Sequence, residues 1–188
     1  MRKNFDTVGF YPQPVLIVGT YDEAGVPDAM NVGWGTLVGK TTVELNISPN
    51  HKTTENLRRK GAFSLSFADL DHLAQADYVG LVSGYDVPDK IARAGLHPLP
   101  SEFVDAPLFQ EFPLTLECRV ETMEDGPGGI RVLGQIVNMN ADEAILGPDG
   151  LVDADKAQFL SFDRVRRVYR LLGSPVGPAY QAGRIYLD

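Results

Sequence analysis

The sequence has few cysteines and comparatively few basic residues, and each shortage excludes a class of protein. Its single cysteine, Cys118, excludes an internal disulfide and any metal site or iron–sulfur cluster that needs several cysteines. Its 17 Lys and Arg stand against 25 Asp and Glu, and the resulting net charge of -8 argues against sequence-independent binding to nucleic acid or to an anionic lipid surface. A small anionic ligand would need a local exception to this charge.

Long hydrophobic runs are also missing. Apolar stretches such as 15–18 soon meet Gly, Asp or Pro, far short of the roughly 20 residues that cross a bilayer. The first residues, Met1 to Asp6, show neither the apolar stretch nor the small-residue cleavage site of a secretory signal. We therefore expect a cytoplasmic protein without a membrane partner, and its 188 residues are enough for one domain, 1–188, with a real core.

Most of the chain has the pattern of short strands separated by turns. Apolar and polar residues alternate at 42–48, 63–67 and 114–121, which predicts strands with one buried face. The runs 15–20 and 130–139 are more evenly apolar, and we expect strands covered on both faces near the centre of the sheet.

The connections favour an antiparallel arrangement. Residues 22–25 and 125–129 separate neighbouring runs at the spacing of hairpin loops. Helical segments are too few for the regular strand–helix alternation of a parallel sheet, so the prediction is a mainly β antiparallel barrel with peripheral helices. The expected helices are 53–60, which ends at Gly61, 70–79, 88–94 and 153–158.

Two segments rich in Gly and Pro have no periodic pattern. Residues 95–113 carry four prolines, and we interpret them as an ordered surface excursion, not as a linker between domains. The tail from 168 to 188 repeats Gly and Pro among aromatic residues, which suggests an extended arm packed on a partner subunit.

Several motifs of catalytic chemistry are incomplete. Gly39-Lys40-Thr41 lacks the earlier glycine of a phosphate-binding P-loop, because position 34 is Trp. A nucleophile elbow around Ser83 would need glycines at positions 81 and 85, where Leu81 and Tyr85 stand. The three histidines form no i, i+4 metal pair, so we expect surface or hydrogen-bonded histidines and no metal. Cys118 occupies an inward strand position; a buried side chain is the expected role, with a reactive thiol as the alternative.

One polar cluster lies where a strand gives way to a helix. Ser48, His51, Lys52 and Thr53 combine hydroxyls, an imidazole and an ammonium within one turn. The unpaired N–H groups of a helix's first turn carry partial positive charge, so a phosphate bound there gains hydrogen bonds and a favourable dipole. The alternative is an ordinary helix cap with Lys52 in solvent.

A second segment suits a flat ligand. The stretch from Met30 to Gly35 reads as a strand in which small residues expose the backbone, while Asn31 and Trp34 offer a polar edge and an apolar wall. A planar heterocycle with donors and acceptors along one edge would fit it. The alternative is a core tryptophan in a sheet.

The order of these segments, together with others, resembles the flavin reductase-like, flavoredoxin-type family. The resemblance covers most of the chain, and only the ordered set is specific. Its segments are Pro12-Gln13-Pro14 with Gly19-Thr20, 29–34, 48–56, Gly61-Ala62-Phe63, Ala76-Asp77-Tyr78 with Ser83-Gly84, Asp89-Lys90, 104–107, Leu116-Glu117-Cys118 and 134–137.

The resemblance implies a Greek-key split β-barrel that binds FMN non-covalently, as a homodimer with its flavin sites near the subunit interface. It also implies roles for individual residues. The isoalloxazine would lie along Met30, Asn31, Val32, Gly33 and Trp34. The phosphate and ribityl chain would be held by Ser48, His51, Lys52 and Thr53, with Asn56 beside them. Ser83, Gly84 and Lys90 would complete the pocket.

In such a protein the flavin itself accepts the hydride, so no residue is expected to act as a catalytic nucleophile. The expected activity is that of an FMN-dependent oxidoreductase supplied with electrons by NAD(P)H. A flavoredoxin-like carrier that receives electrons from a redox partner protein is a second reading. A non-catalytic flavin- or nucleotide-binding module, a sensor or a store, is the alternative from another class, and a barrel used only for protein interaction is a further one.

Overall fold

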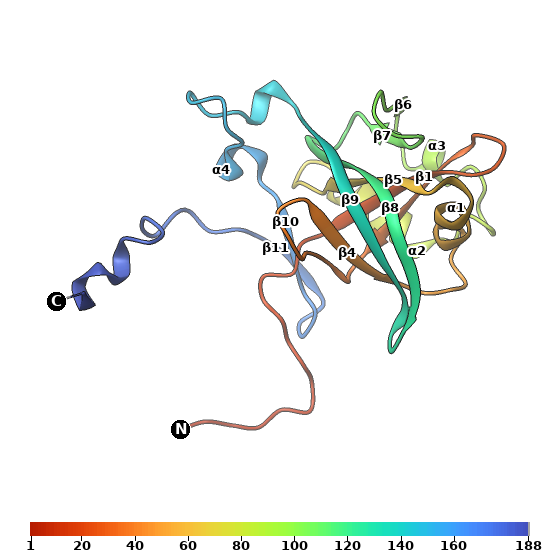
Figure 1. Ribbon diagram of the computed structural model, residues 1–188. Coiled ribbons are helices and arrows are strands. Elements are labelled where there is room, and N and C mark those ends of the chain that lie inside the picture. The colour runs from red at the N-terminus through yellow and green to blue at the C-terminus, as the bar shows by residue number, and fades with distance from the viewer. Residues whose placement is uncertain (188) are drawn as a thin grey trace.

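The main sheet of the molecule has seven strands in the order β2-β1-β5-β8-β9-β4-β3 (Figure 1). Every neighbouring pair in this sheet is antiparallel, as the hairpin spacings predict. The computed structural model describes residues 1–187, so Asp188, the last residue of the expected arm, lies outside the described residues. The strands are β1 (Leu16–Tyr21), β2 (Pro27–Val32), β3 (Gly35–Leu37), β4 (Thr42–Ile47), β5 (Ala62–Phe67), β8 (Leu114–Gly126) and β9 (Gly129–Ala141).

The two edge strands of this sheet follow one another in the chain. Only Gly33 and Trp34 separate β2, which pairs with β1, from β3, which pairs with β4. The sheet therefore curls until its two edges meet at this pair of residues. Gly35 faces the interior, where a Cβ atom would lie 2.8 Å from Leu16 Cδ1 and 2.9 Å from Leu45 Cδ2. The predicted mainly β split barrel is confirmed.

Both predicted hairpins are confirmed. Between β1 and β2, the Asp22 carboxylate accepts hydrogen bonds from the N–H groups of Ala24 and Val26 at 3.0 and 2.8 Å, and Gly25 supplies a φ of 80°. Asp and Gly in these roles are the ordinary chemistry of a short turn. The second hairpin joins β8 to β9 through the pairing of Gly126 with Gly129.

The prediction of strands covered on both faces is right for β1 and wrong for β9. Ile17 and Val18 point to opposite faces of β1, and both are 0% exposed. In β9, Ile130 and Val132 are buried whereas Arg131 is exposed and forms an ion pair with Glu44 on β4. The helices α2 (Leu73–Leu81) and α3 (Lys90–Arg93) contact β2, at one edge of the sheet, whereas Arg131 on β9 stays exposed.

The helices lie outside the sheet close to their expected positions. Helix α1 (Lys52–Lys60) ends at Gly61, whose φ of 64° is the left-handed conformation expected at a helix end. Helix α2 begins later than expected, because the Asp69 carboxylate accepts the His72 N–H and holds 69–72 as a turn. The remaining helices are α2 (Leu73–Leu81), α3 (Lys90–Arg93) and α4 (Ala154–Ala157), with short 3-10 turns at Glu143–Ile145 and Ala182–Tyr186.

Two small β-ladders were not predicted from the sequence. Residues 95–113 contain β6 (Pro98–Pro100) and β7 (Pro107–Phe109), which pair with each other. Strand β11 (Val168–Leu171) pairs with β10 (Leu160–Asp163), so the predicted arm begins after residue 171 and not at 168. Strands of three or four residues are too short to show an alternating pattern.

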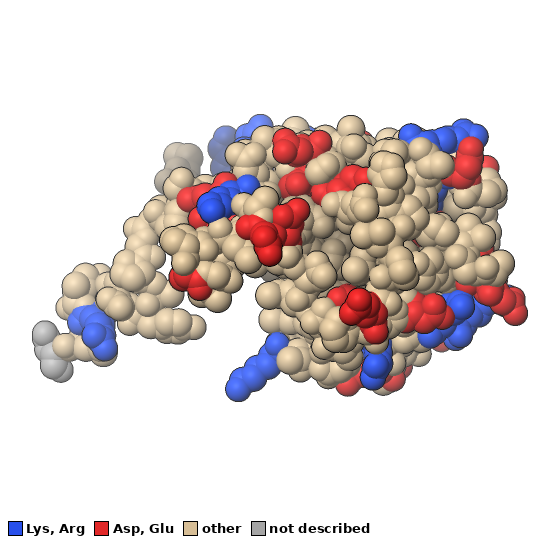
Figure 2. Space-filling view, turned by 90° about the horizontal axis from the view of Figure 1, so that it is seen from above, with Lys and Arg blue, Asp and Glu red and all other residues tan. Residues whose placement is uncertain are grey.

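The arm that remains extends away from the barrel (Figures 1 and 2). Its apolar side chains have little to pack against, and Val176 and Tyr180 are fully exposed. None of the helices within residues 1–187 combines the length and apolar character needed to span a membrane.

Candidate functional site

A buried carboxylate, Asp28 on β2, lies at the centre of the region that the sequence predicts to bind a ligand. Its side chain is 3% exposed and pairs with the Lys90 ammonium, which is 4% exposed, at 2.8 Å. Its other oxygen accepts a hydrogen bond from the Thr53 hydroxyl at 3.1 Å. Asp28 thereby joins β2, the N-terminus of α1 and α3. This residue was not predicted from the sequence, although a charged side chain inside a strand pattern was a signal for it.

The loop before α3 packs directly onto this carboxylate. At Gly84, a Cβ atom would lie 2.5 Å from Asp28 Oδ1 and 3.0 Å from the Lys52 side chain, so only glycine fits without movement. Next to it, the Tyr85 hydroxyl donates to Glu55 on α1 at 2.6 Å, and this bond holds the pKa of the Glu55 carboxyl below its usual value. The structure therefore brings the predicted Ser83-Gly84 loop beside α1.

Lys52 also faces a carboxylate, but more loosely. Its ammonium lies 3.4 Å from Asp22 in the β1–β2 turn, and about a fifth of each side chain is exposed. Burial alone would raise the pKa of Asp22, but hydrogen bonds from Val26 and Lys52 outweigh it, so this pKa lies below its usual value. Of the two predicted lysines, Lys52 is the one that an incoming anion can reach.

The first turn of α1 supplies the other accessible groups. His51 is exposed, and its side chain makes no capping hydrogen bond to the helix. Ser48 is half-buried, and its carbonyl accepts the Thr54 hydroxyl at 2.6 Å, which fixes the approach of the chain into the helix. The first N–H groups of an α-helix have no partner within the helix, so Lys52 and Thr53 carry such backbone donors, of which Lys52 is the more exposed and Thr53 is 1% exposed.

Besides Thr53 and Lys90, four more predicted site residues have side chains that are turned into the protein. Asn56 is 1% exposed and donates to the Thr20 hydroxyl at 2.9 Å, which ties α1 to β1. Met30 and Val32 are buried in the barrel core, so only their backbone can face a ligand. Asn31 is half-buried and donates to the Ala76 carbonyl at 3.2 Å. These contacts favour positioning roles for their side chains.

An apolar cavity of about 920 Å³ opens beside the point where the two sheet edges meet. Trp34 is on its wall and is 53% exposed, so the core-tryptophan alternative is wrong. The cavity extends into the barrel, where its walls are mainly apolar side chains. Representative lining residues are Phe10, Leu16, Leu37, Phe67 and Met139.

Two groups beside Trp34 were not found from the sequence. The Gln13 carboxamide lines the same cavity and donates to the Gly33 carbonyl, while its buried Oε1 accepts no hydrogen bond from residues 1–187. Such an unsatisfied buried acceptor is costly and uncommon. On the other side, the Arg164 guanidinium stacks over Trp34 at 4.9 Å from the ring centroid. Both contacts join segments distant in sequence.

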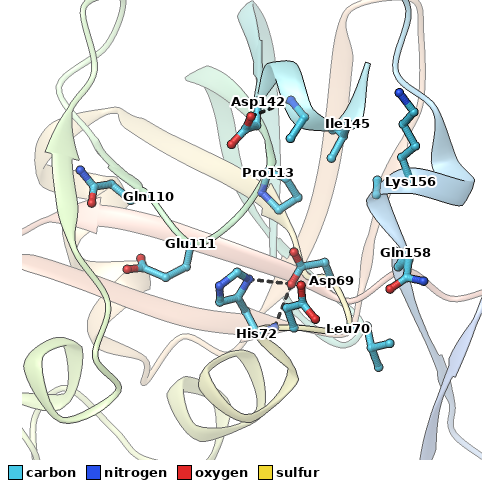
Figure 3. Close-up of a pocket in the computed structure, with 13 residues that line it drawn as sticks. Asp69, Leu70, His72, Gln110, Glu111, Pro113, Asp142, Ile145, Lys156 and Gln158 are labelled. Atoms are coloured by element: carbon cyan, nitrogen blue, oxygen red, sulfur yellow. Dashed lines mark hydrogen bonds and ion pairs between the residues drawn. The ribbon is translucent and has the colours of Figure 1, made fainter. Parts of the chain in front are cut away.

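A second pocket, of about 450 Å³, is polar and lies near the start of α2 (Figure 3). There, Asp69 accepts a hydrogen bond from the His72 imidazole at 2.8 Å. His97 similarly contacts Glu111, at 2.6 Å. The prediction of surface or hydrogen-bonded histidines is confirmed: His72 and His97 are hydrogen-bonded, and His97 and His51 are exposed.

Cys118 is buried on β8, as predicted. Its side chain is 0% exposed within the barrel core, and burial raises the pKa of its thiol to about 12. A thiol with this pKa is almost entirely protonated near neutral pH and so is a poor nucleophile. The reactive-thiol alternative is therefore wrong.

Comparison with known proteins supports the family suggested by the sequence. The family described as the flavin reductase like domain matches residues 8–159. The structure is similar to the flavoredoxin of Desulfovibrio vulgaris (Miyazaki F), with 31% identity, coverage of 97% of this chain and 100% of that chain, and a TM-score of 0.92. It is also similar to the flavoredoxin from Methanosarcina acetivorans, with 26% identity, 99% and 98% coverage, and a TM-score of 0.89.

One further relative is similar in sequence, and its name states no activity. An uncharacterised protein of Halalkalibacterium halodurans is 26% identical over 182 residues, which cover 88% of this chain and 81% of that protein.

Proposed function

This chain belongs to the flavin reductase-like family, and from that premise we propose that it is an FMN-binding oxidoreductase supplied with electrons by NAD(P)H. The similarity to the flavoredoxin of Desulfovibrio vulgaris, which covers nearly the whole of both chains, is the observation that carries the proposal. The flavin, when bound, supplies the redox chemistry; the protein holds it, orients it and controls access to it.

The residues at the site fit the two ends of a flavin nucleotide. For the phosphate, the first turn of α1 offers backbone N–H groups together with the accessible Lys52 and His51. For the ring, Gly33 and Trp34 border an apolar cavity, and the orphaned Gln13 Oε1 is an acceptor that a ring N–H could satisfy. We assign the phosphate end to α1 and the ring to Gly33 and Trp34.

The remaining predicted residues then support these contacts. Lys90 fixes the Asp28 carboxylate, which in turn fixes Thr53 at the start of α1. Gly84 allows its loop to lie against Asp28, and Asn56 anchors α1 to β1. We call the start of α1, with Ser48, His51, Lys52 and Thr53, the corner. In this proposal the positive charge at the corner comes from Lys52 and the helix N-terminus, because the Lys90 charge is already balanced by Asp28.

A visible spectrum of the purified protein tests the proposal. The protein is expected to be yellow, or to bind added FMN, and anaerobic NADH or NADPH is expected to bleach the colour. If the purified protein contains no flavin and also binds no added FMN, the proposal is refuted. If bound flavin resists the nicotinamide but is reduced by a redox protein, the carrier function suggested by the flavoredoxin similarity holds instead. A flavin that neither reductant changes indicates a sensor or store.

We also propose that the molecule is a homodimer, with the C-terminal arm packed on the partner subunit. Val176, Tyr180 and Tyr186 are exposed and give the arm an apolar surface that does not pack against its own barrel. Light scattering is expected to return twice the 20.5 kDa chain mass. A monomer mass with FMN bound would contradict this part of the proposal.

A further inference from the structure

Three arginines without ion pairs stand together in the turn between β10 and β11. Arg164, Arg166 and Arg167 are all exposed. Within residues 1–187, no carboxylate lies within 4.0 Å of their guanidinium groups, although seven other Lys and Arg side chains have such partners. Like charges so close together repel one another, and a cluster of three positive side chains contrasts with the net charge of -8 of the chain. An external anion would balance them.

The turn that carries these arginines is held in one shape by a buried carboxylate. Asp163 is 3% exposed and accepts hydrogen bonds from the Tyr11 hydroxyl at 2.7 Å, the Arg166 N–H at 3.0 Å and the Arg170 side chain at 2.9 Å. Arg167 has a φ of 55°, the left-handed conformation that closes the turn. The arginine side chains therefore project from a fixed backbone, which lowers the entropic cost of binding.

The turn also lies at the mouth of the apolar cavity. Arg164 stacks on Trp34, which lines the cavity, and the exposed Lys40 lines it as well. Hydrogen bonds between the N-terminal segment and β10 keep the hairpin in place, as in the bond from the Phe162 N–H to the Gln13 carbonyl at 2.7 Å. Figure 1 shows the hairpin beside this segment. Two cationic groups, those of Arg164 and Lys40, thus lie beside a space with apolar walls.

We propose that this turn binds the phosphate groups of the nicotinamide dinucleotide donor and directs its nicotinamide end toward the cavity beside Trp34. The proposal rests on the proposed function, because it takes the donor to be a dinucleotide. Guanidinium groups match phosphate oxygens in pairs of parallel hydrogen bonds, and three of them suit a ligand with adjacent phosphates. The cavity volume lies within the range of small-ligand sites.

Equilibrium binding of NADP+ and NAD+ to the flavin-loaded protein tests this assignment without turnover. Trp34 is the single tryptophan, so its fluorescence reports events at the cavity mouth, and calorimetry gives an independent affinity. The variant R164Q/R166Q/R167Q is expected to bind both dinucleotides at least about tenfold more weakly, since several charge-assisted contacts are lost. Its affinities for FMN and for riboflavin are expected to shift by the same factor, because Arg164 contacts Trp34 whereas the phosphate of FMN is assigned to α1.

The matched control is R58Q, which removes an exposed arginine from α1 and should leave dinucleotide affinity unchanged. Nicotinamide riboside, which has no phosphate, should bind the triple variant and the unaltered protein equally. As a test that needs no variant, raising the salt concentration should weaken dinucleotide binding to the unaltered protein, because screening acts strongly on exposed charges.

Four results would overturn the assignment. They are equal dinucleotide affinity in the triple variant, no dinucleotide binding to the unaltered protein, loss of FMN but not riboflavin affinity in the variant, or loss only of reduction by an acidic redox protein. The third result would place the phosphate of FMN at the turn, and the fourth would make the turn a protein-docking surface. Failure of the unaltered protein to bind any flavin would refute the proposed function instead.

Discussion

The corner at the start of α1 and the turn between β10 and β11 both carry basic side chains, but they use them differently. At the corner, Lys90 is buried against Asp28, and Lys52 faces Asp22. In the turn, the guanidinium groups of Arg164, Arg166 and Arg167 have no acidic partner within 4.0 Å in the part of the chain that the structure describes. The contrast teaches that a count of basic residues does not show which charges a ligand can use.

The largest effect is expected when the buried pair at the corner is broken. Asp28→Asn leaves the Lys90 ammonium buried without its counter-ion, which should lower the free energy of unfolding by about 3–5 kcal/mol. Urea unfolding measures this change. The matched control is Asp89→Asn, which removes a surface pair with Arg93 and should cost at most about 1 kcal/mol. Equal losses in the free energy of unfolding would mean that the buried ion pair contributes no more to stability than the exposed one.

The next effect concerns the cation at the corner that remains accessible. Lys52→Ala should weaken FMN binding by about 1.5–3 kcal/mol, the range for a hydrogen bond to a charged group. Riboflavin, which lacks the phosphate, should bind equally to both proteins in a fluorescence titration. Lys60→Ala, at the other end of α1, serves as the control. Unchanged FMN affinity in Lys52→Ala would place the phosphate elsewhere.

A smaller effect should follow from crowding the same corner. Gly84→Ala puts a Cβ atom 2.5 Å from Asp28 Oδ1, and such overpacking typically costs about 1–3 kcal/mol. Gly177→Ala in the arm has no neighbouring atom within 4 Å and should leave stability almost unchanged. Thermal unfolding of the two variants makes the comparison, and a neutral Gly84→Ala would show that the loop does not need its close approach.

The smallest effect is expected at the turn and depends on pH. The Tyr11 hydrogen bond, with help from Arg166 and Arg170, lowers the pKa of Asp163 to about 2, whereas an unfolded Asp titrates near 3.9. Because the folded pKa is the lower one, the stabilisation is complete above about pH 4 and is lost as the pH falls toward 2. Melting temperatures of the unaltered protein and Asp163→Asn should therefore converge over this interval. A difference in melting temperature that stays constant from pH 4 to pH 2 would contradict the lowered pKa of Asp163.

Local chemistry explains why much of the fold could be predicted. The hairpin at Asp22 to Gly25 and the end of α1 at Gly61 depend on residues within a few positions of each other, and both were predicted correctly. The alternation in β4 and the inward position of Cys118 also follow from short-range patterns. The antiparallel barrel was predicted from the spacing of strands and turns, and its split-barrel form from the family resemblance.

The parts that could not be predicted depend on contacts between distant segments. Asp28 gains its role only when α1 and α3 fold against β2, so its position in the sequence gives no sign of its two partners. Likewise, Arg164 meets Trp34 across 130 positions. The sequence does place Ser48, Lys52 and Thr53 together correctly, but it cannot show that the Thr53 hydroxyl is already bonded to a carboxylate.

Strand β10 begins at residue 160, immediately after the family match ends at residue 159. Only the exposed tip of the β10–β11 hairpin, residues 164–167, can diverge without disturbing the barrel, because Leu160 of β10 is buried in the core and hydrogen-bonded to residue 68. Relatives with the same flavin-binding core could then accept electrons from different reductants through changes in this tip alone. Transplanting the exposed residues 164–167 between two such relatives should carry the choice of reductant with it.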